Sequence, residues 1–131
     1  MEYLVDTTFL IHRWREGAAG PEQRFIDSHR DSEVGIPWVV KGEFLRGAVL
    51  AGHPPAEVRE FLDRYRVAWP DDETLSVYAA AYAALFRSRQ LIGPHDIWIA
   101  ACALRVGLPL LTRNVHEFRR VVGLEIHDYS A

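Results

Sequence analysis

The feature that most constrains the fold is the regular alternation of short apolar segments with longer segments of helical periodicity. Strands are expected at residues 2–5, 33–36, 66–69, 108–112 and 124–129. Helices are expected between them, at residues 7–16, 21–30, 37–51, 55–62, 71–90, 95–106 and 114–122. Strands that alternate with helices pair in parallel and need helices on both faces. The sequence therefore predicts an α/β protein, a three-layer α/β/α domain with a mostly parallel central sheet.

The length and composition of the chain fit one domain of an ordinary globular protein. Its 131 residues are expected to form a single domain over residues 1–131, because two cores would each be near the lower size limit for folding. The 49% hydrophobic and 25% charged residues exclude a disordered or fibrous chain. No apolar run reaches the roughly 18 residues that a membrane span needs, and no signal-peptide pattern opens the chain. We expect a cytoplasmic protein that does not contact a membrane.

Polar residues stand where two of the predicted strands end. Asp6 follows the first strand, and Thr112, Arg113 and Asn114 follow a later one. In open parallel sheets, ligands bind beyond the carboxyl ends of the strands. Asp6 is thus a candidate ligand residue, although an acid at this position could equally cap the helix that follows.

Two further acids lie on predicted helices. Glu43 shares a helical stripe with Val39 and Val40, and an unpaired carboxylate buried there would cost several kcal/mol. A metal or a basic partner is therefore expected beside it. Asp96 follows a Gly93-Pro94 break and opens a helix, so it is either a cap or dipole partner of that helix or a ligand residue.

The chemistry that these acids suit is phosphodiester hydrolysis with a hard divalent cation. Carboxylates and water are the ligands that Mg²⁺ and Mn²⁺ prefer, and such a site stabilises charge on a phosphate. Zinc is disfavoured, because the six histidines show no zinc-binding spacing and the single cysteine has no pair. The net charge of −3 excludes a molecule-wide attraction for polyanions, so any contact with nucleic acid must be local.

Four segments carry a resemblance to a known family. They are Leu4-Val5-Asp6-Thr7-Thr8, Lys41-Gly42-Glu43-Phe44-Leu45-Arg46-Gly47, Gly93-Pro94-His95-Asp96-Ile97-Trp98-Ile99-Ala100-Ala101 and Leu111-Thr112-Arg113-Asn114-Val115-His116-Glu117-Phe118. Together and in this order the chain resembles PIN domains, and in particular the VapC-type toxins of toxin–antitoxin pairs. The segment from Gly93 to Ala101 is the most specific part of the match.

The resemblance implies a metal-dependent endoribonuclease, the toxin of a type II toxin–antitoxin system, that cuts tRNA or another structured RNA. It implies that Asp6, Glu43 and Asp96 hold Mg²⁺ or Mn²⁺ and activate the attacking water. It also implies a homodimer and a cognate antitoxin that covers the active-site groove. The competing interpretation is a non-catalytic PIN-like module that docks a protein or RNA.

One position departs from the family pattern. Asn114 stands where many relatives carry a fourth acid, and Glu117 follows one helical turn later. Glu117 could supply the missing charge, but the spacing of the two residues favours a capping box. Thr7 and Thr112 are auxiliary candidates that could orient water or phosphate, although hydroxyls at turns usually bond local backbone.

Basic residues near these motifs are the candidates for RNA contact. Arg113 is expected beside the acids. Arg13, Lys41 and Arg46 are expected within reach on the two flanking helices. Arginine and lysine side chains bind phosphate oxygens, so each could hold the RNA backbone.

Overall fold

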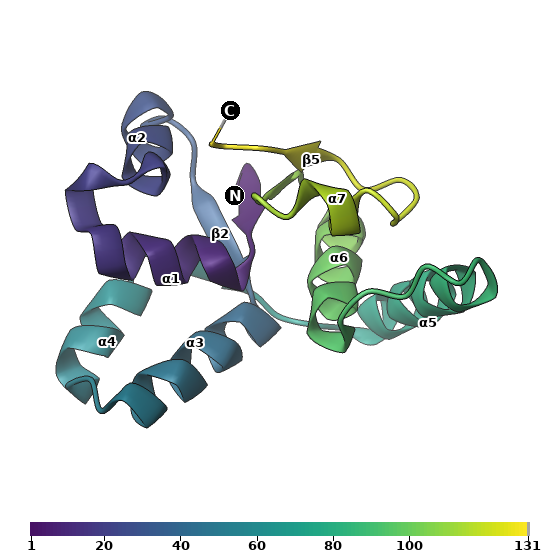
Figure 1. Ribbon diagram of the computed structural model, residues 1–131, viewed down its shortest axis with the longest axis horizontal. Helices are drawn as coiled ribbons and strands as arrows, with labels where there is room; N and C mark the ends of the chain where they lie inside the picture. Colours follow the sequence, from purple (N-terminus) through teal and green to yellow (C-terminus); the bar gives the residue numbers. More distant parts are fainter. Residues whose placement is uncertain (131) are drawn as a thin grey trace.

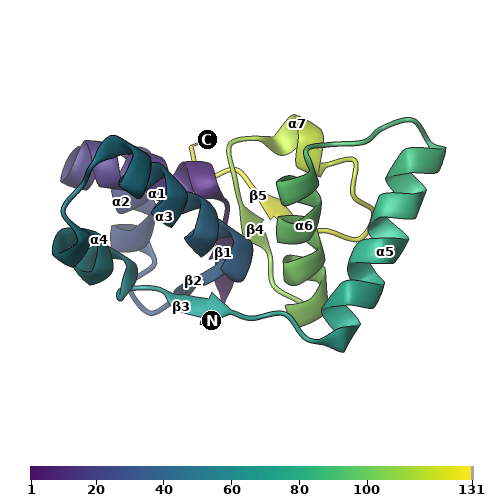
Figure 2. The same ribbon diagram turned by 90° about the horizontal axis from the view of Figure 1, so that it is seen from below.

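The computed structural model describes residues 1 to 130, and Ala131, the last residue of the predicted domain, lies outside the described residues. Five strands form one parallel sheet (Figure 1), and their order is β3-β2-β1-β4-β5, as the strand labels of Figure 2 show. The strands are β1 (Tyr3–Val5), β2 (Val34–Pro37), β3 (Arg66–Ala68), β4 (Leu110–Leu111) and β5 (Ile126–His127). The predicted α/β class and parallel sheet are confirmed.

Helices cover both faces of this sheet, as the strand order requires. The helices are α1 (Thr7–Glu16), a short 3-10 helix η1 (Gly17–Ala19), α2 (Pro21–Ser28), α3 (Trp38–Ala51), α4 (Pro55–Leu62), α5 (Asp72–Arg87), α6 (Pro94–Val106) and α7 (Val115–Phe118). Connections between parallel strands are right-handed, so those that run from β1 to β3 lie on one face and those from β3 to β5 on the other. Figure 2 shows this arrangement, with α1 to α4 on one side and α5 to α7 on the other.

The central strands are buried on both faces, which explains their continuous apolar sequence. Leu4 of β1 pairs with Gly35 of β2 and with Leu110 of β4. Leu4, Val5 and Leu110 are fully buried, so these strands show no alternation of apolar and polar residues. The buried apolar side chains of both helical layers join these strands in one core cluster.

Element boundaries differ from the sequence prediction mainly at the carboxyl-terminal end of the chain. The strands β4 and β5 have two residues each where five and six were expected, and α7 has four residues where nine were expected. Of these two strands only β5 is at the edge of the sheet, where it pairs on one side, and Gly123 turns the backbone with a φ of +85° before β5. The predicted break after α1 contains η1, which the sequence pattern did not indicate. Among residues 1–130, no helix is long and apolar enough to cross a membrane.

Candidate active site

The candidate site lies at the carboxyl edge of the sheet, where β1 and β4 end side by side. Val5 pairs with Leu111, so Asp6 and Thr112 leave the sheet next to each other. The connections on the two sides of these strands cover opposite faces, and this topology opens a crevice for a ligand. Figure 2 shows this edge, with α7 above it, opposite the amino terminus.

Asp6 is both a helix cap and a site residue. Its carboxylate is 4% exposed, and Oδ1 accepts a hydrogen bond of 3.0 Å from the Phe9 backbone N–H at the start of α1. Oδ2 accepts a hydrogen bond of 2.6 Å from the Thr112 hydroxyl. Burial raises the pKa of Asp6, and the two hydrogen bonds oppose that effect. The predicted cap is confirmed, and the second oxygen is held by Thr112 at the end of β4.

Glu43 is half-buried and has polar partners. Its Oε1 accepts a hydrogen bond of 2.8 Å from the Thr7 hydroxyl, so this hydroxyl holds a site carboxylate and not local backbone. Its Oε2 lies 3.0 Å from Nδ1 of His95 and 3.8 Å from Nη2 of Arg46. The sequence predicted a metal or a basic partner at Glu43. His95, at the start of α6, is that basic partner, and the sequence pattern gave no indication of it.

Asp96 is the third residue of α6 and does not cap it. The N-cap is Gly93, and no side chain makes a capping hydrogen bond there. The interpretation of Asp96 as a cap is therefore wrong, although its place in the first turn still suits the helix dipole. The pKa of Asp96 is raised to about 6, first by burial and then by the charges of Glu117, Asp6 and Glu43. The other three carboxylates therefore lie close enough to Asp96 to disfavour its ionised form.

The predicted capping box of Asn114 and Glu117 is wrong. Asn114 is the N-cap of α7, but its side chain makes no capping hydrogen bond. Its Nδ2 instead donates to Oε2 of Glu117 at 3.0 Å, and its backbone N–H donates to the Thr112 hydroxyl at 2.9 Å. These bonds orient Glu117, whose charge has the largest effect of any nearby group on the pKa of Asp96. Glu117 thus brings to the cluster the negative charge that Asn114 does not carry.

Two of the four predicted RNA-contact residues lie near these acids, and two do not. Arg46 is exposed beside Glu43, and Arg113 follows Thr112. Arg13 lies instead near the amino-terminal end of β2, beside Tyr65. Lys41 faces the groove between α3 and α4. The predicted position of Arg13 and Lys41 is wrong. Successive residues of an α-helix are rotated by about 100° about its axis. Lys41, two positions before Glu43, and Arg13, six positions after Thr7, therefore lie on other faces of their helices than those two residues.

The donor set fits a hard divalent cation. Asp6, Glu43, Asp96 and Glu117 offer only carboxylate oxygens, which is the chemistry that Mg²⁺ and Mn²⁺ prefer. The charges of Glu117, Asp6 and Glu43 each raise the pKa of Asp96, although among residues 1–130 these acids do not form a group whose ligand oxygens all lie within 4.8 Å of one another. Within residues 1–130, no hydrogen bond is donated to the Asp96 carboxylate, so its oxygens are available to a ligand.

The fold and the acidic cluster define the chain as a parallel α/β domain with an acidic site at the carboxyl ends of its strands. The model of the PIN domain family matches residues 3–124, which is most of the chain. The chain belongs to the PIN domain family.

Curated relatives of similar length carry ribonuclease names. Ribonuclease VapC1 of Haemophilus influenzae strain R2866 is 26% identical over 133 aligned residues, which cover 99% of each chain. The tRNA(fMet)-specific endonuclease VapC of Shigella flexneri is 29% identical over the same share of both chains. Ribonuclease VapC1 of Rickettsia felis is 44% identical over 59 residues, 45% of this chain and 44% of the relative.

Solved structures of toxin–antitoxin complexes share the fold. VapBC-1 from nontypeable Haemophilus influenzae superposes with a TM-score of 0.84 at 24% identity and covers 100% of both chains. DNA-bound VapBC from Salmonella typhimurium superposes with a TM-score of 0.87 at 24% identity, with 98% of each chain covered. At this identity the similarity establishes the fold and the order of its elements.

Proposed function

We propose that the chain is a divalent-metal-dependent endoribonuclease and the toxin of a toxin–antitoxin pair. The observation that carries this proposal is the meeting of four carboxylates, from four different elements or their ends, at the carboxyl edge of the sheet. Glu43 and Asp96 come from α3 and α6, Asp6 from the end of β1, and Glu117 from α7. Such a cluster is costly for the fold and is explained by the cation that it holds.

Two of the four acids, Asp6 and Glu43, have hydrogen-bond partners that fix their carboxylate oxygens. Thr112 fixes one oxygen of Asp6, and Thr7 and His95 fix the two oxygens of Glu43. Asp96 and Glu117 complete the oxygen ligands. When bound, Mg²⁺ or Mn²⁺ supplies a Lewis acid that stabilises charge on the phosphate and lowers the pKa of water. The hydroxyl and imidazole contacts keep the carboxylates in place before the cation arrives, which reduces the reorganisation that binding requires.

The substrate that we propose is structured RNA, with tRNA as the first candidate. Support comes from the Shigella flexneri relative, whose name specifies tRNA(fMet), and from the ribonuclease names of the other relatives. Support for contact with the RNA backbone comes from two basic residues: Arg46, whose guanidinium lies 3.8 Å from Glu43, and Arg113, which directly follows Thr112 in the chain. Arginine forks bind phosphate oxygens in pairs, so both suit a phosphodiester next to the metal.

Cleavage assays with matched variants test this function. The protein is incubated with an initiator tRNA and an elongator tRNA, in Mg²⁺, Mn²⁺ or EDTA. We expect cleavage with either metal, none in EDTA, and a loss of about 100-fold or more in Asp96→Asn. The exposed acid Asp31 gives the matched control, Asp31→Asn, which keeps full activity. Cleavage that persists in EDTA, or in Asp96→Asn, would refute the proposal.

Glu117→Gln tests whether Glu117 is a fourth metal ligand or only supports the structure. The amide keeps the shape of the side chain and removes its charge, so weaker metal binding is expected without loss of folding. The readout is the Mn²⁺ concentration at half-maximal cleavage, which should rise by roughly tenfold or more. An unchanged Mn²⁺ requirement would mean that Asp6, Glu43 and Asp96 alone bind the metal.

Asn114→Asp tests whether a further acid strengthens metal binding. The substitution restores the acid that the family pattern has at this position, so it should lower the Mn²⁺ concentration at half-maximal cleavage.

We also propose two protein partners, a cognate antitoxin and a second copy of the chain. The antitoxin is supported by the toxin–antitoxin complexes that share the fold. The homodimer is supported by α5, which packs on α6 and leaves the apolar side chains of Leu75, Tyr82 and Phe86 exposed. Light scattering on the purified chain should give the mass of a dimer, and Phe86→Glu should give a monomer. A wild-type monomer at micromolar concentration would refute the dimer.

The non-catalytic alternative loses its main support. It rested on Asn114, which removes an acid from the family pattern, and on the acidic pI of the chain, near 6.0. Glu117 brings a carboxylate to the same cluster, so the number of acids around the proposed cation is not reduced.

A further inference from the structure

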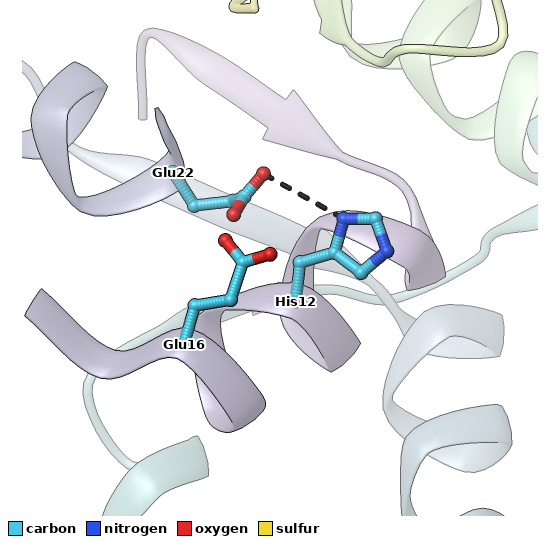
Figure 3. Close-up of side chains that lie close together, drawn as sticks. All are labelled: His12, Glu16 and Glu22. Atoms are coloured by element: carbon cyan, nitrogen blue, oxygen red, sulfur yellow. Dashed lines mark ion pairs between the residues drawn. The ribbon is translucent and has the colours of Figure 1, made fainter. Parts of the chain in front are cut away.

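A second group of metal-ligand side chains lies on the other side of Arg113 from the four-carboxylate cluster. It consists of His12 and Glu16 on α1 and Glu22 on α2. Each side chain offers one ligand atom, and these atoms all lie within 4.8 Å of one another. Figure 3 shows the two carboxylates and the imidazole pointing toward one place between the two helices.

Glu22 is the unusual member of this group. Its side chain is fully buried, and neither carboxylate oxygen has a hydrogen-bond donor among the described residues. The nearest cationic atoms, Nδ1 of His12 at 3.8 Å and Nη1 of Arg113 at 4.0 Å, lie beyond hydrogen-bond distance. A buried carboxylate normally accepts hydrogen bonds or meets a cation at close range. The fold therefore holds an acceptor group for which residues 1–130 supply no close donor.

Neighbouring groups do not complete the coordination of Glu22. The Tyr129 hydroxyl lies beside Glu22 without a well-formed hydrogen bond to it, and burial, the charges of Glu22 and Asp6, and the contact with the Glu22 carboxylate raise the pKa of Tyr129. Arg113 donates a hydrogen bond of 2.9 Å to Nδ1 of His12, because a guanidinium can only donate. Arg113 is thereby engaged by His12 and stays 4.0 Å from the nearer carboxylate oxygen of Glu22.

We propose that His12, Glu16 and Glu22 form a second cation site, for a divalent transition metal such as Mn²⁺ or Zn²⁺. One imidazole nitrogen and two carboxylates are a mixed ligand set that transition metals accept, whereas Mg²⁺ prefers oxygen alone. The four-carboxylate cluster contains only oxygen ligands, so Mg²⁺ suits that cluster better than it suits this site, whereas Mn²⁺ suits both. This proposal does not depend on the ribonuclease activity.

Arg113 links the two sites. A cation bound by His12 takes over the Nδ1 lone pair, so the hydrogen bond from Arg113 is lost. The guanidinium, which is 39% exposed, is then free to turn away from Glu22. Because Arg113 directly follows Thr112, which holds Asp6, its release adds a mobile basic group at the carboxyl edge of the sheet.

Mn²⁺ binding to the full chain tests the proposal by a method that does not use RNA. The Asp96→Asn variant weakens the four-carboxylate cluster, and electron paramagnetic resonance then follows the Mn²⁺ that stays bound. We expect bound Mn²⁺ with a ¹⁴N coupling from one imidazole, which is lost in His12→Gln and kept in the matched variant His95→Gln. No bound Mn²⁺, or a nitrogen coupling that survives His12→Gln, would overturn the proposal.

Glu22→Gln provides a second test, in which a loss of metal affinity can be told apart from a loss of folding. The substitution neutralises a buried carboxylate that has no hydrogen-bond donor, so the Tm of the metal-free protein should stay the same or rise. Mn²⁺ affinity should fall by roughly tenfold or more, and Mn²⁺ should no longer raise the Tm. The exposed acid Glu57 supplies the control, since Glu57→Gln should bind as the wild type does. Equal affinity in Glu22→Gln and wild type contradicts the assignment.

Because Arg113 competes with the metal, its substitution should change Mn²⁺ affinity in the opposite direction to Glu22→Gln. Arg113→Gln removes the cation that shares Nδ1 of His12, so Mn²⁺ should bind more tightly in this variant. Weaker binding in Arg113→Gln would show that the guanidinium does not compete with Mn²⁺ for Nδ1 of His12, and would overturn the proposal.

Discussion

Replacing Asp96 with asparagine should stabilise the metal-free protein while it removes the proposed activity. The pKa of Asp96 is raised from 3.8 to about 6 by burial and by the charges of Glu117, Asp6 and Glu43. The folded state thus binds this proton more tightly than the unfolded state does. The protonated carboxyl favours folding fully below about pH 3.8, and this contribution is lost as the pH rises through about 6.

The magnitude follows from the two pKa values. Ionisation of Asp96 costs the fold about 0.5 kcal/mol at pH 4 and up to roughly 3 kcal/mol at pH 7, with little further change above that pH. The residue keeps some exposure to solvent, so these figures are upper values. Asp96→Asn, which stays neutral, should gain stability over the wild type by a similar amount, and the gain should grow with pH.

Urea unfolding in EDTA between pH 4 and pH 8 measures this difference. The wild type and Asp96→Asn are compared at each pH, with Asp31→Asn as the control that should follow the wild type. Saturating Mn²⁺ should remove the advantage of Asp96→Asn, because the metal stabilises only the fold that binds it. A difference that is constant with pH, or a variant less stable than the wild type at pH 7, would refute the electrostatic reasoning.

Three other substitutions test separate parts of the structure. Thr112→Val removes the hydroxyl that donates to Asp6 and should cost about 1–3 kcal/mol in urea unfolding. It should also raise the pKa of Asp6, as carboxyl NMR titration would show. Gly35→Ala places a Cβ 3.0 Å from the backbone oxygen of Arg66 in the next strand and should lower stability by about 1–3 kcal/mol, measured by thermal unfolding. Phe118→Ala opens a cavity at a fully buried position and should cost about 3–5 kcal/mol, measured by urea unfolding at pH 7.

A specific result would contradict each of these three predictions. Thr112→Ser keeps the hydroxyl, so it should behave as the wild type, and a loss equal to that of Thr112→Val would show that the methyl group is what matters. A Gly35→Ala protein as stable as the wild type would mean that β2 and β3 separate at no cost. A Phe118→Ala loss below about 1 kcal/mol would mean that the core closes around the gap.

Much of the fold could be predicted from local sequence, and three of the four acids, Asp6, Glu43 and Asp96, were candidates from the sequence. The apolar run before Asp6 and the Gly93-Pro94 break gave the strand and helix that carry two of the acids, because strand burial and proline geometry act over a few residues. Local patterns failed at Asn114 and Glu117, whose spacing is that of a capping box. The side chain of Asn114 instead donates to Glu117, and Glu117 is drawn to a cluster that includes residues from the other end of the chain.

The sequence by itself determined the parallel α/β layout and the position of Asp6 at a strand end. Both follow from periodicity and from residues that are neighbours along the chain. Only the tertiary structure decided that His95 contacts Glu43 across 52 residues, that Thr112 holds Asp6 across 106, and that Arg13 and Lys41 point away from the acids. These contacts depend on which strands are adjacent and on the rotation of each helix about its axis. A single sequence that is analysed one segment at a time contains neither the order of the strands in the sheet nor the rotation of the helices.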